Sequence, residues 1–374
     1  MIKGKQLKKE MRCEKEGSKL KLKNKIGKKK RNIYIIISAI ALLVIGVSVF
    51  WVSGIFKNNN NEPDKTVETT PEAPNDEKKL QIVDINSTSR PYAIMINNIN
   101  VARPLQSGLQ DAYIIYEMIV EGGITRYMAL FLDQNTERIG SIRSARHYYL
   151  DYALENDAIY VHHGQSPQAQ RDFSSLDIDR IAVDNTKTGW RDNTLNVSTE
   201  HRLFTSIEKL NSGLGNIRTE RKNDLLLNYS IDELDLSKYD NAKTANEVTI
   251  KYSGSVTNTY EYDSDAKVYK RYVNGEAHTD YVTKEQYTFK NIITYQVRNY
   301  TINDGENKGR QELENIGSGT GYYISDGYAV PIKWEKSSRS SQTKYYFENG
   351  EELIVNDGNT FIQIQPMGQT LTIK

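Results

Sequence analysis

The longest apolar stretch of the chain lies near its start. Residues 33–56 are 24 consecutive positions without a charged side chain, and Lys28-Lys29-Lys30-Arg31 lie just before them. A run of this length predicts one membrane-spanning helix. A cleaved signal peptide would have a shorter apolar region, of about 7–15 residues, and a small-residue cleavage site. We therefore expect a single-pass anchor that is retained.

The segments on either side of this span differ in charge. Residues 1–31 carry 14 Lys and Arg against 3 Glu, which leaves a net charge of −10 for the rest of the chain. The positive-inside rule predicts that residues 1–32 form a cytoplasmic basic tail and that the body lies outside the cell membrane. Residues 57–80 are polar and contain Pro63, Pro71 and Pro74, so we expect a disordered linker.

Shorter apolar runs predict a mixed α/β domain over residues 81–246. The runs at 112–120 and 124–132 are separated by Glu121-Gly122-Gly123, a pattern that predicts a β-hairpin. Apolar positions recur at helical spacing over 141–156, and Ser141 or Ser144 could cap the start of such a helix. Strands are expected at 92–96, 157–161 and 181–184, and a further helix at 203–210.

Residues 247–374 have a different pattern, rich in Tyr, Thr and Val. Turn dipeptides at Asn274-Gly275, Asp326-Gly327, Asn349-Gly350 and Asp357-Gly358 separate segments typical of strands, which predicts a β-meander. The run Gly317-Ser318-Gly319-Thr320-Gly321 lacks the spacing of a phosphate-binding loop and is interpreted as flexible. The expected fold class is α+β: an N-terminal membrane anchor, a mixed α/β first domain and a C-terminal, mostly antiparallel β domain.

Composition excludes several functions. The acidic body has no basic stripe and no zinc-finger spacing, so nucleic acid is not an expected partner. Cys13 is the single cysteine and lies in the basic tail. The body therefore has no cysteine that could act as a nucleophile or metal ligand, and no disulfide can form within one chain. Because no cysteine follows the apolar run, lipid attachment at a processed cysteine is excluded as well.

Candidate chemistry gathers in residues 113–167. Strand alternation predicts that Glu117 and Glu121 project to the same side of the first hairpin arm, with Arg126 at the start of the second. A glycosidase requires two carboxyl groups at a defined separation, which neighbouring positions on the same side of a strand could provide. An apolar pocket would raise a carboxyl pKa towards general-acid duty, and a nearby arginine would keep it ionised. The sequence leaves both environments open, and His163 is the third catalytic candidate.

A second set of polar residues is expected to bind an anion. Arg143 and Arg146, with Ser144 between them, would lie in the first turn of the predicted helix. Cations there oppose the helix dipole and call for a compensating anion, either a ligand or an internal Glu117 or Glu121. The other candidate binding residues are Arg126, Arg191 and His201. No metal site and no cofactor are expected, because adjacent residues such as His162 and His163 point apart along a strand.

The order of several motifs resembles the YerB-like family of envelope proteins, which carry a two-part domain of unknown function. The matching motifs include Arg103-Pro104-Leu105-Gln106-Ser107-Gly108-Leu109, Glu121-Gly122-Gly123-Ile124-Thr125-Arg126 and His163-Gly164-Gln165-Ser166-Pro167. Family members are often lipoproteins, whereas this chain lacks the lipidated cysteine. It also has Gly140-Ser141-Ile142-Arg143-Ser144 where Gly-Pro-Val-Arg-Ser is usual, and Glu200-His201-Arg202 where Pro-His-Asn is usual. The resemblance implies an envelope location and this architecture, but no reaction.

Two functions remain open from the sequence. The protein is expected to bind or process a cell-wall polymer, or to bind an envelope protein, through its Glu/Arg/His cluster. One version is a cell-wall glycan hydrolase or lyase that uses Glu117 or Glu121 as acid/base. The other is a non-catalytic, partner-binding envelope module in which the same residues form an internal ion-pair network.

Overall fold

The computed structural model describes residues 78–374. The predicted basic tail, the predicted membrane span 33–56 and most of the predicted linker lie outside this part. Within residues 78–374, no helix has the length and apolar character needed to cross a membrane.

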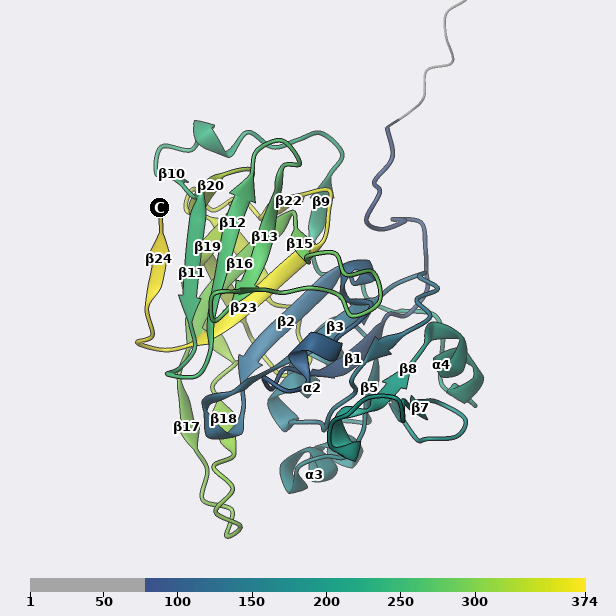
Figure 1. The fold of residues 1–374 in the computed structure, drawn as a ribbon. Helices are drawn as coiled ribbons and strands as arrows, with labels where there is room; N and C mark the ends of the chain where they lie inside the picture. The colour runs from purple at the N-terminus through teal and green to yellow at the C-terminus, as the bar shows by residue number, and fades with distance from the viewer. Residues whose placement is uncertain (1–77) are drawn as a thin grey trace, which may run out of the picture. The chain divides into compact units, whose positions relative to one another are not determined.

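The described chain is mostly β, with few helices and several sheets. Its centre is an eleven-stranded sheet that runs through the whole body (Figure 1). The strands of this sheet are, in spatial order, β10 (Lys243–Thr244), β20 (Tyr328–Lys336), β19 (Gly317–Ser325), β16 (Asn291–Val297), β23 (Thr360–Pro366), β2 (Ile114–Ile119), β3 (Thr125–Phe131), β1 (Tyr92–Asn97), β5 (Ile159–His162) and β6 (Arg180–Ala182), with β21 (Lys344–Phe347) on β20.

The two halves of the sequence share this sheet. Strand β23, near the C-terminus, lies between β16 and β2 and is parallel to both. Residues 81–246 and 247–374 are therefore joined by backbone hydrogen bonds. The parallel pairing also departs from a simple meander, in which neighbouring strands are antiparallel.

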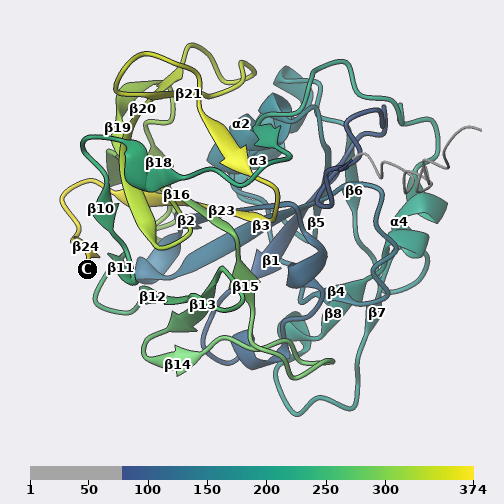
Figure 2. The ribbon, with the colours of Figure 1, turned by 90° about the horizontal axis from the view of Figure 1, so that it is seen from above.

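A second sheet, of six strands, packs over β2 and β23. Figure 2 shows it on one side of the central sheet, with α2 on the other. Its strands are β14 (Glu276–Ala277), β13 (Val268–Val273), β12 (Thr257–Asp263), β11 (Glu247–Lys251) and β24 (Leu371–Ile373), with β15 (Thr288–Phe289) on β13. Because successive strand side chains alternate, Tyr116 of β2 faces α2 and donates to Glu155, while Glu117 faces the second sheet.

The helices, the 3-10 turns and three small sheets complete the fold. The helices are α2 (His147–Glu155), α3 (Pro167–Ser175) and α4 (Ile207–Gly213), and the short 3-10 turns are η1 (Arg103–Leu105), η2 (Leu109–Asp111), η3 (Glu121–Gly123), η4 (Thr199–His201) and η5 (Leu236–Lys238). The small sheets are β4 (Ile139–Gly140), β8 (Leu203–Thr205) and β7 (Trp190–Arg191), then β17 (Asn299–Thr301) with β18 (Gln311–Leu313), and β22 (Ile354–Asn356) with β9 (Asn228–Ser230).

Several predicted elements are confirmed. The hairpin around Glu121-Gly122-Gly123 is formed by β2 and β3. The turns at Asn274-Gly275 and Asp326-Gly327 connect antiparallel strands, and both turns place an asparagine or aspartate and the following glycine at positive φ. Such turns match the twist of the flanking strands, which is why these dipeptides were informative.

Three local predictions were wrong. The helix expected over 141–156 begins only at His147, because residues 141–145 are extended and pair with the ends of β1 and β5. The helix expected over 203–210 is the strand β8 followed by α4, which Ser206 caps. The glycine run at 317–321 is not a flexible segment but the start of β19.

The glycines in β19 are required by close packing. A Cβ on Gly321 would lie 2.3 Å from the carbonyl oxygen of Thr294, and one on Gly319 would lie 2.7 Å from Trp334 Nε1. We expect Gly321→Ala to lower the free energy of unfolding by about 1–3 kcal/mol, because the backbone of β16 must move. Chemical denaturation would measure this. Gly254→Ala, at a position without positive φ where a Cβ would meet nothing within 4 Å, is the control for glycine loss without a clash.

Candidate functional site

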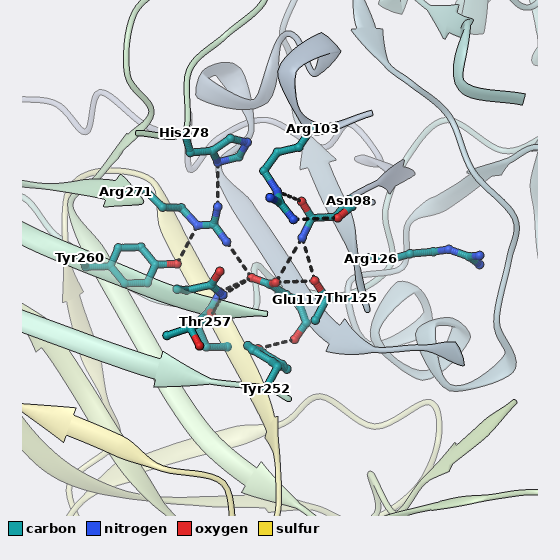
Figure 3. Close-up of polar contacts among 12 residues, drawn as sticks. Asn98, Arg103, Glu117, Thr125, Arg126, Tyr252, Thr257, Tyr260, Arg271 and His278 are labelled. Atoms are coloured by element: carbon teal, nitrogen blue, oxygen red, sulfur yellow. Dashed lines mark hydrogen bonds and ion pairs between the residues drawn. The ribbon is translucent and has the colours of Figure 1, made fainter. Parts of the chain in front are cut away.

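Glu117 lies in a closed polar network between the two sheets (Figure 3). Its side chain has no solvent exposure. Oε1 accepts from Thr125 Oγ1 at 2.6 Å and from Asn98 Nδ2 at 3.4 Å. Oε2 accepts from Arg271 Nη2 at 2.9 Å, and the further donors to this oxygen are Asn258 Nδ2 at 2.8 Å and Gln363 Nε2 at 3.1 Å. Both carboxylate oxygens are thus occupied by protein donors.

Arg271 is the counterion that the sequence analysis did not assign to Glu117. It comes from β13, which is 154 residues away in the sequence. Its Nε donates to Tyr260 Oη at 3.1 Å, and its Nη1 lies 2.7 Å from His278 Nδ1. Because arginine only donates, Nδ1 of His278 must accept, so the ring proton is on Nε2 and is donated to Gln106 Oε1.

His278 is therefore a neutral histidine. Burial, followed by the charges of Arg271 and Arg103, lowers its pKa well below the usual value. Arg271 lies on β13 and His278 follows β14, so both belong to one hairpin. However, no periodicity in a single sequence links that hairpin to Glu117.

Glu121 does not join Glu117, and the predicted same-side arrangement was wrong. Strand β2 ends at Ile119, and Glu121 enters the turn η3, where strand alternation no longer applies. There it forms a two-pronged ion pair with Arg146, at 2.5 and 2.9 Å. Burial favours the protonated form, but Arg146 and Arg126 outweigh it and hold the pKa of Glu121 below its usual value. This carboxylate is an ionised partner, which is a poor general acid.

Arg126 lies between these groups and is almost fully buried. Its side chain points away from Glu117 (Figure 3) and donates from Nη1 to the carbonyl oxygen of Ser144 at 2.7 Å. Its distance to Glu121 is 3.9 Å. Burial, followed by the positive charge of Arg146, lowers the pKa of Arg126 to about 10.

The other candidate residues meet at the carboxyl ends of the parallel strands β1 and β5. Residues 141–145 run across these ends, where the backbone N–H of Arg143 donates to Met95 O and that of His163 donates to Arg143 O. Ligands of open α/β sheets commonly bind outside the carboxyl ends of parallel strands. We call Arg126, Arg143, Arg146, His163, Arg191 and His201 the Arg/His cluster.

Both histidines of the cluster are held by neighbours. His163 Nδ1 lies 2.7 Å from Val183 O and must donate to it, so Nε2 is the acceptor for Arg191 Nη2 at 3.2 Å. In His201, Nδ1 lies 2.9 Å from Asn97 Nδ2, and Nε2 lies 3.3 Å from Glu200. Burial is the main cause that lowers the pKa of His201. Neither ring keeps a free nitrogen for proton transfer in this state.

Like Arg191, Arg143 is a partly exposed cation of the cluster. Its side chain is 24% exposed, and its carboxylate neighbour is Glu200, at 3.6 Å and 57% exposed. Ser144 lies beside it, and a Cβ at Gly164 would lie 3.0 Å from Ser144 Oγ, so the glycine keeps this loop close. Among residues 78–374, no group of three or more His, Cys, Asp or Glu side chains is placed to hold a metal ion.

The arrangement thus separates the predicted site into two parts. Glu117 belongs to an enclosed network. The second part lies at the carboxyl ends of β1 and β5, where Arg126 and His201 are buried and Arg143, Ser144, Arg146, His163 and Arg191 are partly exposed, with Glu121 as an internal counterion. The geometry suits anion binding, because arginine guanidinium groups recognise carboxylate and phosphate in a fork.

Comparisons with known proteins agree with the motif resemblance. Residues 80–220 match the N-terminal domain, and residues 248–362 the C-terminal domain, of the protein of unknown function DUF3048. A Bacillus subtilis (strain 168) protein named "Putative lipoprotein YerB" is 32% identical over 295 residues, which cover 74% of this chain and 81% of that protein. The crystal structure of YerB from Bacillus subtilis has a TM-score of 0.64 and 27% identity, and covers 76% of this chain and 94% of that chain. The chain therefore belongs to the DUF3048 family, whose members are proteins of unknown function.

Proposed function

We propose that the protein is a non-catalytic module of the cell envelope that binds an anionic wall polymer through the Arg/His cluster. The proposal rests on the net positive charge of this cluster and its neighbouring carboxylates. Four guanidinium groups, those of Arg126, Arg143, Arg146 and Arg191, face two carboxylates, Glu121 and Glu200, which leaves a formal charge of +2. The nearby Asp192 is paired with Arg138 at 3.0 Å.

The location is part of the same proposal. The apolar segment 33–56 would anchor the chain as a single-pass span with the N-terminus in the cytoplasm, so that the body faces the wall. The relative named "Putative lipoprotein YerB" supports attachment to a membrane, although its name indicates a lipid in place of a membrane-spanning segment. Wall polymers outside the membrane carry carboxylate and phosphodiester groups, which are the anions that an arginine fork recognises.

The contact between Arg143 and Glu200 is weak enough for the anion of a ligand to replace the Glu200 carboxylate. An exposed ion pair contributes at most about 1 kcal/mol. A hydrogen bond between charged groups in a better enclosed site contributes about 1.5–3 kcal/mol. A polymer anion that contacts Arg143 and Arg191 together can therefore displace Glu200.

The alternative is a wall glycan hydrolase or lyase with Glu117 or Glu121 as acid/base. A general acid or base must come within hydrogen-bond reach of its substrate. Glu117 has no exposed surface and Glu121 is paired with Arg146, so the geometry favours binding over turnover. Incubation with peptidoglycan followed by mass spectrometry of the products would detect the alternative.

Binding is tested by co-sedimentation of the full-length protein, in detergent, with purified wall material. We expect Arg143→Gln/Arg191→Gln to weaken binding by about tenfold or more, because two charge-assisted contacts are lost. Binding should also fall with salt, since exposed charges are screened over about 8–10 Å.

Arg171→Gln is the matched control, because Arg171 is exposed and forms no ion pair within residues 78–374. Equal binding by the double variant and the native protein would contradict the proposed site, provided that both unfold at the same denaturant concentration. Release of cleaved wall fragments would contradict the non-catalytic assignment.

A further inference from the structure

A pocket of about 440 Å3 opens beside the buried Glu117 network. One wall is formed by Asn100, Arg103 and Pro104 around η1, and the other by residues 273–279, which include the hairpin of β13 and β14. His278 and Arg103 approach each other across the network in Figure 3. This pocket is not part of the Arg/His cluster.

Arg103 is held in the pocket wall by neutral acceptors alone. Its Nε donates to Asn98 Oδ1 at 3.1 Å, and its Nη2 donates to Asn98 O at 3.2 Å and to Asn100 Oδ1 at 3.1 Å. Within residues 78–374 no carboxylate lies within ion-pair distance of it, and its Nη1 has no hydrogen-bond partner. Three bonds therefore orient a guanidinium whose charge has no direct counterion.

The rear of the pocket adds no negative charge. His278 is neutral and buried, and behind it Arg271 is balanced by Glu117 at 2.9 Å. Of the described residues that line the pocket, Glu276 is the one carboxylate, and its side chain is exposed on the hairpin. The amide of Asn100 and the hydroxyl of Thr279 supply further polar groups in the lining.

We propose that this pocket is a second binding site, which takes an oxyanion, either a carboxylate or a phosphate group, on the fork of Arg103. The asparagine contacts pre-orient the guanidinium, so less side-chain entropy is lost when the anion binds. The pocket is separate from the polymer site of the proposed function. Asn97 at the end of β1 contacts His201, whereas the next residue, Asn98, contacts Arg103 and Glu117, so the two sites lie on opposite sides of the chain here.

The assignment explains a motif that the Arg/His cluster leaves unused. In the segment Arg103-Pro104-Leu105-Gln106, the arginine carries the anion site and Gln106 accepts from His278 Nε2. Gln106 also donates to the carbonyl oxygen of Asn97. The motif thus places an uncompensated cation at the pocket and ties it to the buried network.

Isothermal titration of the full-length protein with inorganic phosphate, and separately with acetate, tests the site. We expect Arg103→Gln to reduce the affinity at least tenfold, and Arg103→Lys to reduce it less, because charge is kept and the fork is lost. Glu276→Gln should instead tighten binding several-fold, since it removes the carboxylate that lines the pocket. The ion that binds with the higher affinity identifies the ligand group as phosphate or carboxylate.

The outcomes separate this site from the proposed polymer site. Arg143→Gln/Arg191→Gln should bind the small ion with native affinity, and Arg171→Gln likewise. Three results would overturn the proposal: a binding heat that is unchanged in Arg103→Gln, a binding heat that is lost in Arg143→Gln/Arg191→Gln, or no binding heat with either ion. Should Arg103→Gln unfold, the gain expected for Glu276→Gln still decides, because the exposed Glu276 side chain forms no hydrogen bond or ion pair within residues 78–374. An unchanged affinity of Glu276→Gln would refute the site.

Discussion

Arg271→Met is expected to lower the free energy of unfolding by about 3–5 kcal/mol, because it leaves the Glu117 carboxylate buried without its cation. The side chains of both residues have zero exposure, and the remaining donors to Glu117 are neutral amides and a hydroxyl. Urea unfolding at pH 7.5 measures the loss. A decrease of this size is a large fraction of the stability of an ordinary domain, about 5–15 kcal/mol.

The controls for this prediction address the pair itself and the protein surface. Glu117→Gln/Arg271→Met should be less destabilised than the sum of the two single variants, because it removes both charges at once. Arg298→Gln breaks a contact of 3.8 Å between exposed groups and should leave the unfolding midpoint unchanged. A native-like stability of Arg271→Met would mean that water reaches Glu117. A stable Glu117→Gln variant that lost a measured wall-cleaving activity would restore the acid/base alternative.

Stability is expected to fall as the pH is lowered from 7.5 to 5, because burial in the folded protein disfavours the protonated form of three histidines. Burial, followed by the charge of Arg180, lowers the pKa of His162 to about 4, and the pKa values of His201 and His278 are lowered as well. In the unfolded chain a histidine binds a proton below about pH 6.5. The unfolded state therefore gains more protons than the folded state in this window, and it is stabilised.

His162 lowers the free energy of unfolding by about 2 kcal/mol at pH 5, and this loss reaches its full size below pH 4, where the folded protein also takes up the proton. His278 adds a contribution of the same sign. Urea unfolding at several pH values above 5 measures the slope before most carboxylates titrate.

The matched variant for the pH dependence is His162→Gln, which should reduce the dependence and leave the part that is due to His201 and His278. In the native chain Nδ1 of His162 donates to Gly164 O, and Nε2 accepts from Arg180. A stability that does not change between pH 7.5 and 5 would show that these rings already carry protons, or that they exchange with solvent.

Local signals in the sequence were sufficient for elements whose structure depends on nearby residues. Glu121-Gly122-Gly123 correctly predicted the turn between β2 and β3, and Asn274-Gly275 the turn between β13 and β14. Such turns are decided by backbone conformations within a few residues. The same local reasoning failed for residues 141–145, where the helical spacing of Ile142 and Ala145 was overridden by pairing with Met95 and Gly164.

By itself the sequence determined the family, and it supplied the candidate residues and an expected tether at 33–56, because ordered motifs, residue types and a long apolar run need no distant partner to be informative. Only the tertiary structure decided how these residues are grouped. Glu117 meets Arg271 across 154 positions, Glu121 turns instead to Arg146, and Arg143 meets Glu200 near the surface. Long-range pairing of β2 with β23 and packing of the second sheet bring Arg271 to Glu117. Burial then sets whether each carboxylate or guanidinium is an internal counterion or is open to a ligand.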